Sequence, residues 1–219
     1  MLKNFKKGLA VLAILALPLA AACSDVSAPV QPEPTETLQS LTSATQLQLN
    51  RILEEEKERI KRAQEASKPT YDSLKVEWER FLRSGSSGGS SSSTLVMCDP
   101  LQYVGQTKII GPLGGSIDFG PHKLLIPAGA LATWTVITAE APTTLGVSAV
   151  FSPHGTRFLV QPELILSYKH CRGLSPQAKA VGYIVNGQIT ERPYSQDRQS
   201  DGLVRSWIGH FSEYALIHP

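Results

Sequence analysis

The sequence lacks a marked excess of charge of either sign. Its 219 residues include 21 Lys and Arg against 19 Asp and Glu, which gives a formal net charge of +2. A protein that binds nucleic acid through a basic surface needs a clear positive excess facing the phosphates, so the composition excludes that class. Aromatic residues are few, at 7%, but a hydrophobic content of 42% is too high for a chain that is disordered throughout.

Motifs of common cofactor and metal sites are also missing. The chain contains neither the dinucleotide-binding pattern G-x-G-x-x-G nor the phosphate-binding pattern G-x-x-x-x-G-K-[ST]. It has only three Cys and five His, with no C-x-x-C pair and no H-x-x-x-H pair. We therefore expect no enzymatic activity and no cofactor. His122, His154 and His218 are expected to be solvated residues in loops or at the terminus.

The apolar run near the N-terminus is too short to cross a bilayer comfortably. It covers residues 9–17, follows Lys3, Lys6 and Lys7, and leads into small side chains. A basic head, a short apolar middle and a small-residue exit predict a secretory signal peptide over residues 1–22. A retained membrane helix is the alternative.

The end of this segment reads Leu19-Ala20-Ala21-Ala22-Cys23 and resembles the lipobox of bacterial lipoproteins. The resemblance implies that Cys23 receives a diacylglyceryl thioether and becomes the acylated N-terminus of the mature protein. Two or more acyl chains, palmitate among them, give a stable membrane anchor. Ser24 follows the cysteine where an Asp would retain an enteric lipoprotein at the inner membrane, which favours the outer membrane of the cell envelope. Ordinary cleavage that leaves Cys23 as a free thiol is the alternative.

Removal of the signal peptide changes the charge balance. Three Lys are lost, so the mature chain has 21 − 3 = 18 basic and 19 acidic residues, a net charge of −1. Because no electrostatic attraction to anionic lipid remains, the lipid on Cys23 must provide the contact with the membrane. Residues 23–36 contain Pro29, Pro32 and Pro34 with few apolar side chains, and they predict a disordered tether.

Residues 37–83 have the periodicity of amphipathic helices. Residues 37–68 contain no Gly or Pro, and apolar side chains recur there every three or four positions. Pro69 is expected to stop this helix, and a second apolar stripe begins after it. We predict a stalk of two helices, in which the first stripe packs against the second helix or stays in solvent. A weak dimeric coiled coil formed by the stalk is the alternative, and it would make the protein a homo-oligomer.

Residues 84–94 contain only Ser, Gly and Thr and predict a flexible linker. Residues 95–219 predict a β-sandwich, because short strand-like runs alternate with Gly and Pro. Asn186-Gly187 indicates a hairpin turn, and Asp201-Gly202 a second turn. The expected strands cover residues 108–110, 116–119, 123–126, 134–139, 147–152, 157–160, 163–168, 180–185, 188–192, 203–208 and 212–217.

Cys98 and Cys171 are the two cysteines of this β region. In an exported protein an isolated pair predicts one disulfide, which would stabilise the fold by about 4 kcal/mol in the chain-entropy model. A metal site that combines the cysteines with His170 is the alternative.

Two stretches of the β region resemble the ZU-five domain of zonula occludens proteins, uncoordinated-five receptors and ankyrins. The first runs from Gly114-Gly115-Ser116-Ile117 to Leu124-Leu125-Ile126-Pro127-Ala128-Gly129-Ala130-Leu131. The second is Phe151-Ser152-Pro153-His154-Gly155-Thr156-Arg157-Phe158, followed by Gln161-Pro162-Glu163-Leu164. The resemblance implies a β-sandwich that serves as a protein–protein interaction module. From period two alone, Leu124, Ile126, Leu164 and Leu166 should point into the core.

Three other functions stay open at this point. One is a purely structural role in the envelope. Another is binding of carbohydrate or cell wall, which needs an exposed row of aromatic rings; the candidates are Trp134, Tyr168, Tyr183, Tyr194 and Trp207, most of them expected in the core.

The third is self-cleavage at His210-Phe211-Ser212, a tripeptide that resembles the site at which some ZU-five domains and other exported β domains cut themselves. There His210 would act as general base for the Ser212 hydroxyl, which would attack the carbonyl of Phe211. The alternative is that these residues belong to the last strand of the core.

Overall fold

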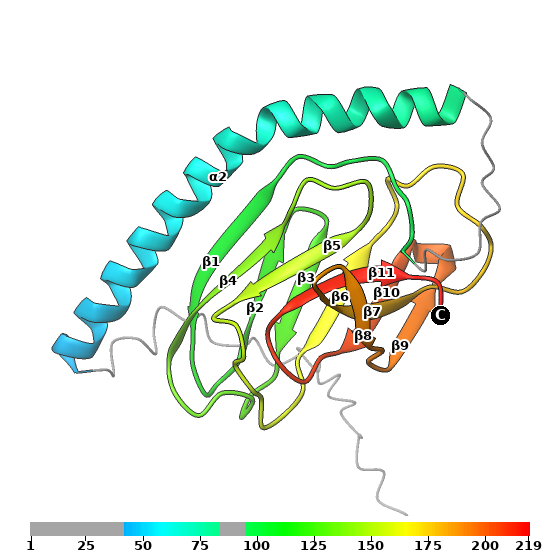
Figure 1. The fold of residues 1–219 in the computed structure, drawn as a ribbon. Helices are drawn as coiled ribbons and strands as arrows, with labels where there is room; N and C mark the ends of the chain where they lie inside the picture. The colour runs from blue at the N-terminus through cyan, green and yellow to red at the C-terminus, as the bar shows by residue number, and fades with distance from the viewer. Residues whose placement is uncertain (1–41, 84–94) are drawn as a thin grey trace, which may run out of the picture. The chain divides into compact units, whose positions relative to one another are not determined.

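The computed structural model describes residues 42–83 and 95–219 of the chain (Figure 1). The signal peptide, the lipidation residue Cys23, the tether, the first residues of the expected stalk and the Ser/Gly linker lie outside the described residues. None of the helices within the described ranges combines the length and hydrophobicity needed to cross a membrane.

A single helix, α2, covers Ser43–Arg83, and Pro69 lies inside it. The prediction that Pro69 ends one helix and starts another is therefore wrong. Pro69 is exposed, and the ribbon of α2 is bent along its length (Figure 1). A proline inside a helix removes one backbone hydrogen bond and crowds the preceding turn, a cost of about 3 kcal/mol that contacts elsewhere on the helix can offset. Here the helix is held on both sides of Pro69, through Leu49 and through Glu79.

The β region forms two antiparallel sheets, as a β-sandwich requires. One sheet has six strands in the order β1-β4-β5-β11-β7-β8, and the other has five in the order β2-β3-β6-β10-β9. The strands are β1 (Val104–Ile110), β2 (Gly115–Phe119), β3 (His122–Ile126), β4 (Thr135–Ala141), β5 (Ser148–Ser152), β6 (Glu163–Ser167), β7 (Ala180–Val185), β8 (Gln188–Glu191), β9 (Ser195–Arg198), β10 (Leu203–Trp207) and β11 (Glu213–Ile217).

Two differences from the expected strands have clear causes. Residues 157–160 form no strand and contribute one bridge, between Arg157 and His210. Strand β9 was not expected because Ser195–Arg198 carries no apolar side chain; it forms the edge of the five-stranded sheet by pairing with β10. The hairpin at Asn186-Gly187 is confirmed, because both residues have positive φ, 51° and 76°, and join β7 to β8.

The core lies between the two sheets and follows the expected period of two. Leu124, Ile126, Leu164 and Leu166 are all buried there, which confirms the prediction. The prediction that His122 is a solvated loop residue is wrong: it begins β3 and is 3% exposed. Its Nδ1 accepts a hydrogen bond from the Ser167 backbone N–H at 3.1 Å, so the buried ring is partnered by a neighbouring strand.

Helix α2 packs on the outer face of the six-stranded sheet, over β1 and β4. The register pairs Gly105 with Glu140, Thr107 with Thr138 and Ile109 with Val136, so these residues share the face opposite the core. Leu49 and the partly buried Leu53 contact Ile109 and Val136. The apolar stripe of this helical stalk therefore packs against a sheet, and the prediction that the stripe packs against a second helix or stays in solvent is wrong.

Candidate functional site

The outer face of the six-stranded sheet continues beyond α2 onto β5, β11 and β7. Across the strands, Glu140 pairs with Val150, Val150 with Glu213 and Glu213 with Ile184. These residues point to the same side as the ones that α2 covers. One half of this face is thus covered by the helix, while the other half holds a pocket.

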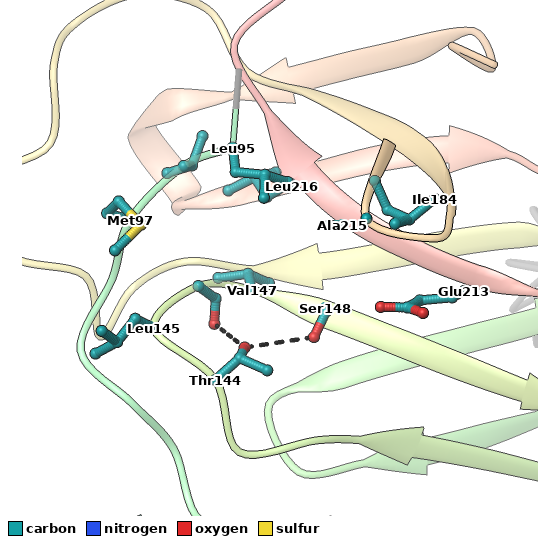
Figure 2. Close-up of a pocket in the computed structure, with 13 residues that line it drawn as sticks. Leu95, Met97, Thr144, Leu145, Val147, Ser148, Ile184, Glu213, Ala215 and Leu216 are labelled. Atoms are coloured by element: carbon teal, nitrogen blue, oxygen red, sulfur yellow. Dashed lines mark hydrogen bonds between the residues drawn. The ribbon is translucent and has the colours of Figure 1, made fainter. Parts of the chain in front are cut away.

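The pocket has a volume of about 260 Å³ and is mainly apolar. Figure 2 shows it between strands β5 and β11 and the segment that contains Leu95 and Met97. Ser148 and Ala215 are register partners on the sheet and line it with small side chains. Because small residues alternate here with larger neighbours, the sheet surface is hollowed at this point. We call this site the Ala215 pocket.

The segment of Leu95 to Met97 forms the opposite wall of the Ala215 pocket. It is fixed to the sheet by a hydrogen bond from the Val96 N–H to the Leu216 carbonyl, at 3.0 Å, and by a bridge between Leu95 and Ile217. Leu95 and Met97 nevertheless remain 38% and 42% exposed. Leu95 and Met97 therefore form a partly exposed apolar rim beside the pocket.

The polar groups of the Ala215 pocket are few. The Thr144 hydroxyl donates to the Gly146 carbonyl at 3.3 Å and lies 3.5 Å from the Ser148 hydroxyl. Figure 2 shows the Glu213 carboxylate on the Ser148 side of the pocket. Among the described residues no ion pair involves Glu213, so its charge can attract a cation on a ligand. The site fits an apolar group with a positive charge nearby.

The predicted disulfide is present between Cys98 and Cys171. It joins the chain just after the pocket wall to the segment that follows β6. His170 Nε2 lies 3.8 Å from the Cys171 sulfur, so the three residues of the alternative metal site do lie together. Both sulfurs are bonded to each other, however, and a disulfide offers no thiolate, so the donor set does not fit a metal ion.

The three residues of the self-cleavage motif, His210, Phe211 and Ser212, lie in different surroundings. Phe211 is buried in the core, with its ring stacked on Phe151 at 5.4 Å between centroids, but the motif ends before β11 begins at Glu213, so the alternative that it belongs to the last strand is wrong. The His210 ring lies edge-on to Tyr183 at 4.7 Å, and its Nε2 is 3.7 Å from a Glu191 carboxylate oxygen. Within residues 95–219 no hydrogen bond joins the His210 ring to the Ser212 hydroxyl.

The backbone around this motif is tied to the loop after β5. The Phe211 carbonyl, the group that self-cleavage would attack, accepts a hydrogen bond from the Gly155 N–H at 3.0 Å. The Phe211 N–H in turn donates to the Thr156 carbonyl at 2.9 Å. One donor therefore already points at the oxygen on which negative charge would develop.

The five aromatic candidates fall into distinct surroundings. Tyr168 is buried and donates to Asp197, Trp134 packs beside α2, and Tyr183 packs against His210. Tyr194 and Trp207 are different, because their rings stack on each other and Tyr194 is 68% exposed. Of the five, Tyr168 alone is buried in the core, while Tyr183 is partly buried against it and Trp134 is partly buried beside α2, so the expectation that most of them lie in the core is wrong.

Sequence reasoning missed the Ala215 pocket and the contact between Arg59 and Glu140. Arg59 donates two hydrogen bonds to Glu140, at 3.1 and 3.0 Å, and Tyr103 donates a third. The pairing of β5 with β11 and the position of α2 decide both features, and no local pattern reports either of them. Comparison with models of known protein families and with curated proteins gave no significant match.

Proposed function

We propose that the protein is a lipid-anchored component of the bacterial cell envelope whose β-sandwich binds a partner protein. The anchor rests on the lipobox-like end of the signal peptide at Cys23, and Ser24 favours the outer membrane. The Ala215 pocket carries the second half of the proposal, because it is an apolar hollow with an exposed rim on the uncovered half of the six-stranded sheet.

The chemistry of the pocket indicates what the partner presents. An apolar side chain would fill the space between Ala215 and the wall of Leu95 and Met97, and a neighbouring Lys or Arg would meet Glu213. The ZU-five resemblance also supports the binding of a partner protein, since that family consists of interaction modules. Weak self-association through α2 is less favoured, because the buried side of this helix is already used by β1 and β4.

Lipidation is tested by the intact mass of the protein isolated from membranes. The wild-type chain should begin at Cys23 and carry the added mass of a diacylglyceryl group and acyl chains. The variant Cys23→Ala should lose that mass and appear in the soluble fraction. A wild-type protein with no added lipid mass would contradict the anchor.

Self-cleavage at Phe211-Ser212 is a second candidate, favoured by the hydrogen bond that Gly155 donates to the Phe211 carbonyl. His210 would take the proton of the Ser212 hydroxyl, the oxygen would displace the Phe211–Ser212 amide nitrogen to give an ester, and water would hydrolyse that ester. The same mass spectrum decides the matter. Loss of residues 212–219 from the wild type under denaturing conditions, and not from Ser212→Ala, would establish cleavage; an intact wild-type mass would exclude it.

A further inference from the structure

A second surface, on the other sheet, carries an exposed ring pair surrounded by planar polar side chains. Strands β6, β10 and β9 are neighbours in the five-stranded sheet, and Glu163 pairs with Trp207 while Arg205 pairs with Gln196. Leu164, Val204 and Ser206 alternate with these residues along the strands and are buried. The side chains of Glu163, Gln196, Arg205 and Trp207 therefore lie on the outer face of the sheet. Helix α2 contacts the opposite sheet.

Tyr194 lies over Trp207 at the end of this face. The two ring centroids are 5.4 Å apart at an interplanar angle of 28°, and the backbone N–H of Trp207 donates to the backbone carbonyl of Tyr194 at 3.2 Å. The Gln196 amide donates to the Tyr194 hydroxyl at 3.0 Å. Since Tyr194 is 68% exposed, the ring face turned away from Trp207 is open to solvent while its orientation is fixed from below.

The polar neighbours of the rings offer both donors and acceptors. Arg205 forms an ion pair with Glu163, in which the guanidinium and the carboxylate are both partly exposed. Together with the Gln196 amide they provide N–H donors and carboxylate oxygens beside the ring pair. Because the two charges neutralise each other, the surface does not select a charged ligand.

From this arrangement we propose that Tyr194, Trp207, Gln196, Arg205 and Glu163 form a binding site for a neutral polysaccharide. The C–H face of a pyranose ring is apolar and would stack on the open face of Tyr194, while its hydroxyls, which donate and accept, would pair with the polar groups. A proline-rich peptide is the rival ligand for exposed aromatic rings. It offers mainly carbonyl acceptors, however, so it could use the N–H donors of this surface but not its carboxylate acceptor, whereas sugar hydroxyls can use both.

The site is independent of the Ala215 pocket, because the two lie on different sheets. Its test uses the full chain, purified in detergent, and soluble hexasaccharides of β-linked glucose and of β-linked N-acetylglucosamine as probes. Binding is followed by calorimetry and by tryptophan fluorescence, to which Trp207 contributes. A proline decapeptide is titrated in parallel.

We expect at least one hexasaccharide to bind, and Tyr194→Ala to weaken that binding about tenfold. Tyr194→Phe keeps the ring and should stay close to wild type, and the matched control Leu159→Ala, which alters an exposed apolar residue of another loop, should have no effect. Thermal unfolding verifies that each variant is folded. Failure of both sugars to bind, binding of the proline peptide alone, or equal affinity of wild type and Tyr194→Ala would each overturn the proposal. Loss of partner capture by the Ala215 pocket would not affect it.

Discussion

At the scale of single residues, Glu140 organises the contact between α2 and the sheet. It accepts two hydrogen bonds from Arg59 and one from Tyr103. Burial, followed by the hydrogen bond to Glu140, raises the pKa of Tyr103 above its ordinary value, and the hydrogen bond to Glu140 raises the pKa of Arg59. The Glu140 side chain is the more buried partner, so its loss should cost more than that of a surface ion pair.

His122 is the residue whose burial most clearly predicts a pH dependence of stability. Burial lowers its pKa from 6.5 to about 4, with the charge of His170 as the second cause. In the unfolded chain the ring gains a proton near its ordinary pKa, whereas in the folded protein it stays neutral until about pH 4. Above pH 6.5 the ring is neutral in both states and does not affect the free energy of unfolding. As the pH falls from 6.5 towards 4, protonation favours the unfolded chain, so the free energy of unfolding decreases.

We therefore expect His122→Asn to flatten the decline of stability between pH 6.5 and 4. Asn does not titrate, and its side-chain oxygen can accept the Ser167 N–H as Nδ1 does. The difference in free energy of unfolding between the wild type and the variant should change by roughly 3 kcal/mol across this pH range. Urea unfolding at successive pH values measures it, with His154→Asn in an exposed loop as the control. Parallel pH profiles for wild type and His122→Asn would be incompatible with a buried neutral ring.

At the scale of secondary-structure elements, the close approach of α2 to β1 depends on Gly105. A Cβ at this position would lie 2.9 Å from both Cγ1 and Cγ2 of Ile60 and 3.0 Å from the Tyr103 hydroxyl. With Ile60 in place, a side chain at position 105 would push the helix from the sheet. The small residue at 105 and the large one at 60 therefore fit each other across the interface.

This fit predicts that Ile60→Cys and Gly105→Cys together form a disulfide, because Cβ atoms in disulfides lie about 3.8 Å apart. The pair is made with Cys23→Ser, so that only the native Cys98–Cys171 bond accompanies it. Thiol titration and peptide mapping should find the new bond in most molecules. The matched control combines Ile52→Cys, on the exposed side of α2, with Gly105→Cys and Ile60→Ala, which removes the clash, and should leave both thiols free. Equal oxidation of the two pairs would mean that α2 does not occupy this position.

The same elements show what the sequence can and cannot predict. Alternation identified the core positions Leu124, Ile126, Leu164 and Leu166, because burial on one face of a strand is written locally in its pattern. Strand β9 was not expected, because its pairing with β10 stabilises a polar segment. Pro69 was misinterpreted for a related reason, since contacts made through Leu49 and Glu79 outweigh a local preference.

At the scale of the whole molecule, the two outer faces of the sandwich carry different features. The face of the six-stranded sheet is shared between α2 and the Ala215 pocket, while the face of the five-stranded sheet carries the Tyr194–Trp207 ring pair. The Cys98–Cys171 bond fixes the chain directly after the pocket wall. Sequence alone could indicate the sandwich and the disulfide, but the pocket depends on the register of β5 against β11, which sequence patterns leave open.

The central claim, that the anchored protein binds its partner through the Ala215 pocket, is tested most directly by photo-crosslinking in intact cells. A photoreactive amino acid replaces Met97 at the pocket rim, and the same residue at exposed Leu159 provides the control. We expect a specific adduct with an envelope protein from position 97 alone. The adduct should decrease about tenfold when Ala215→Phe fills the pocket of a chain that remains folded. No adduct from position 97, or an adduct that Ala215→Phe leaves unchanged, would contradict the account.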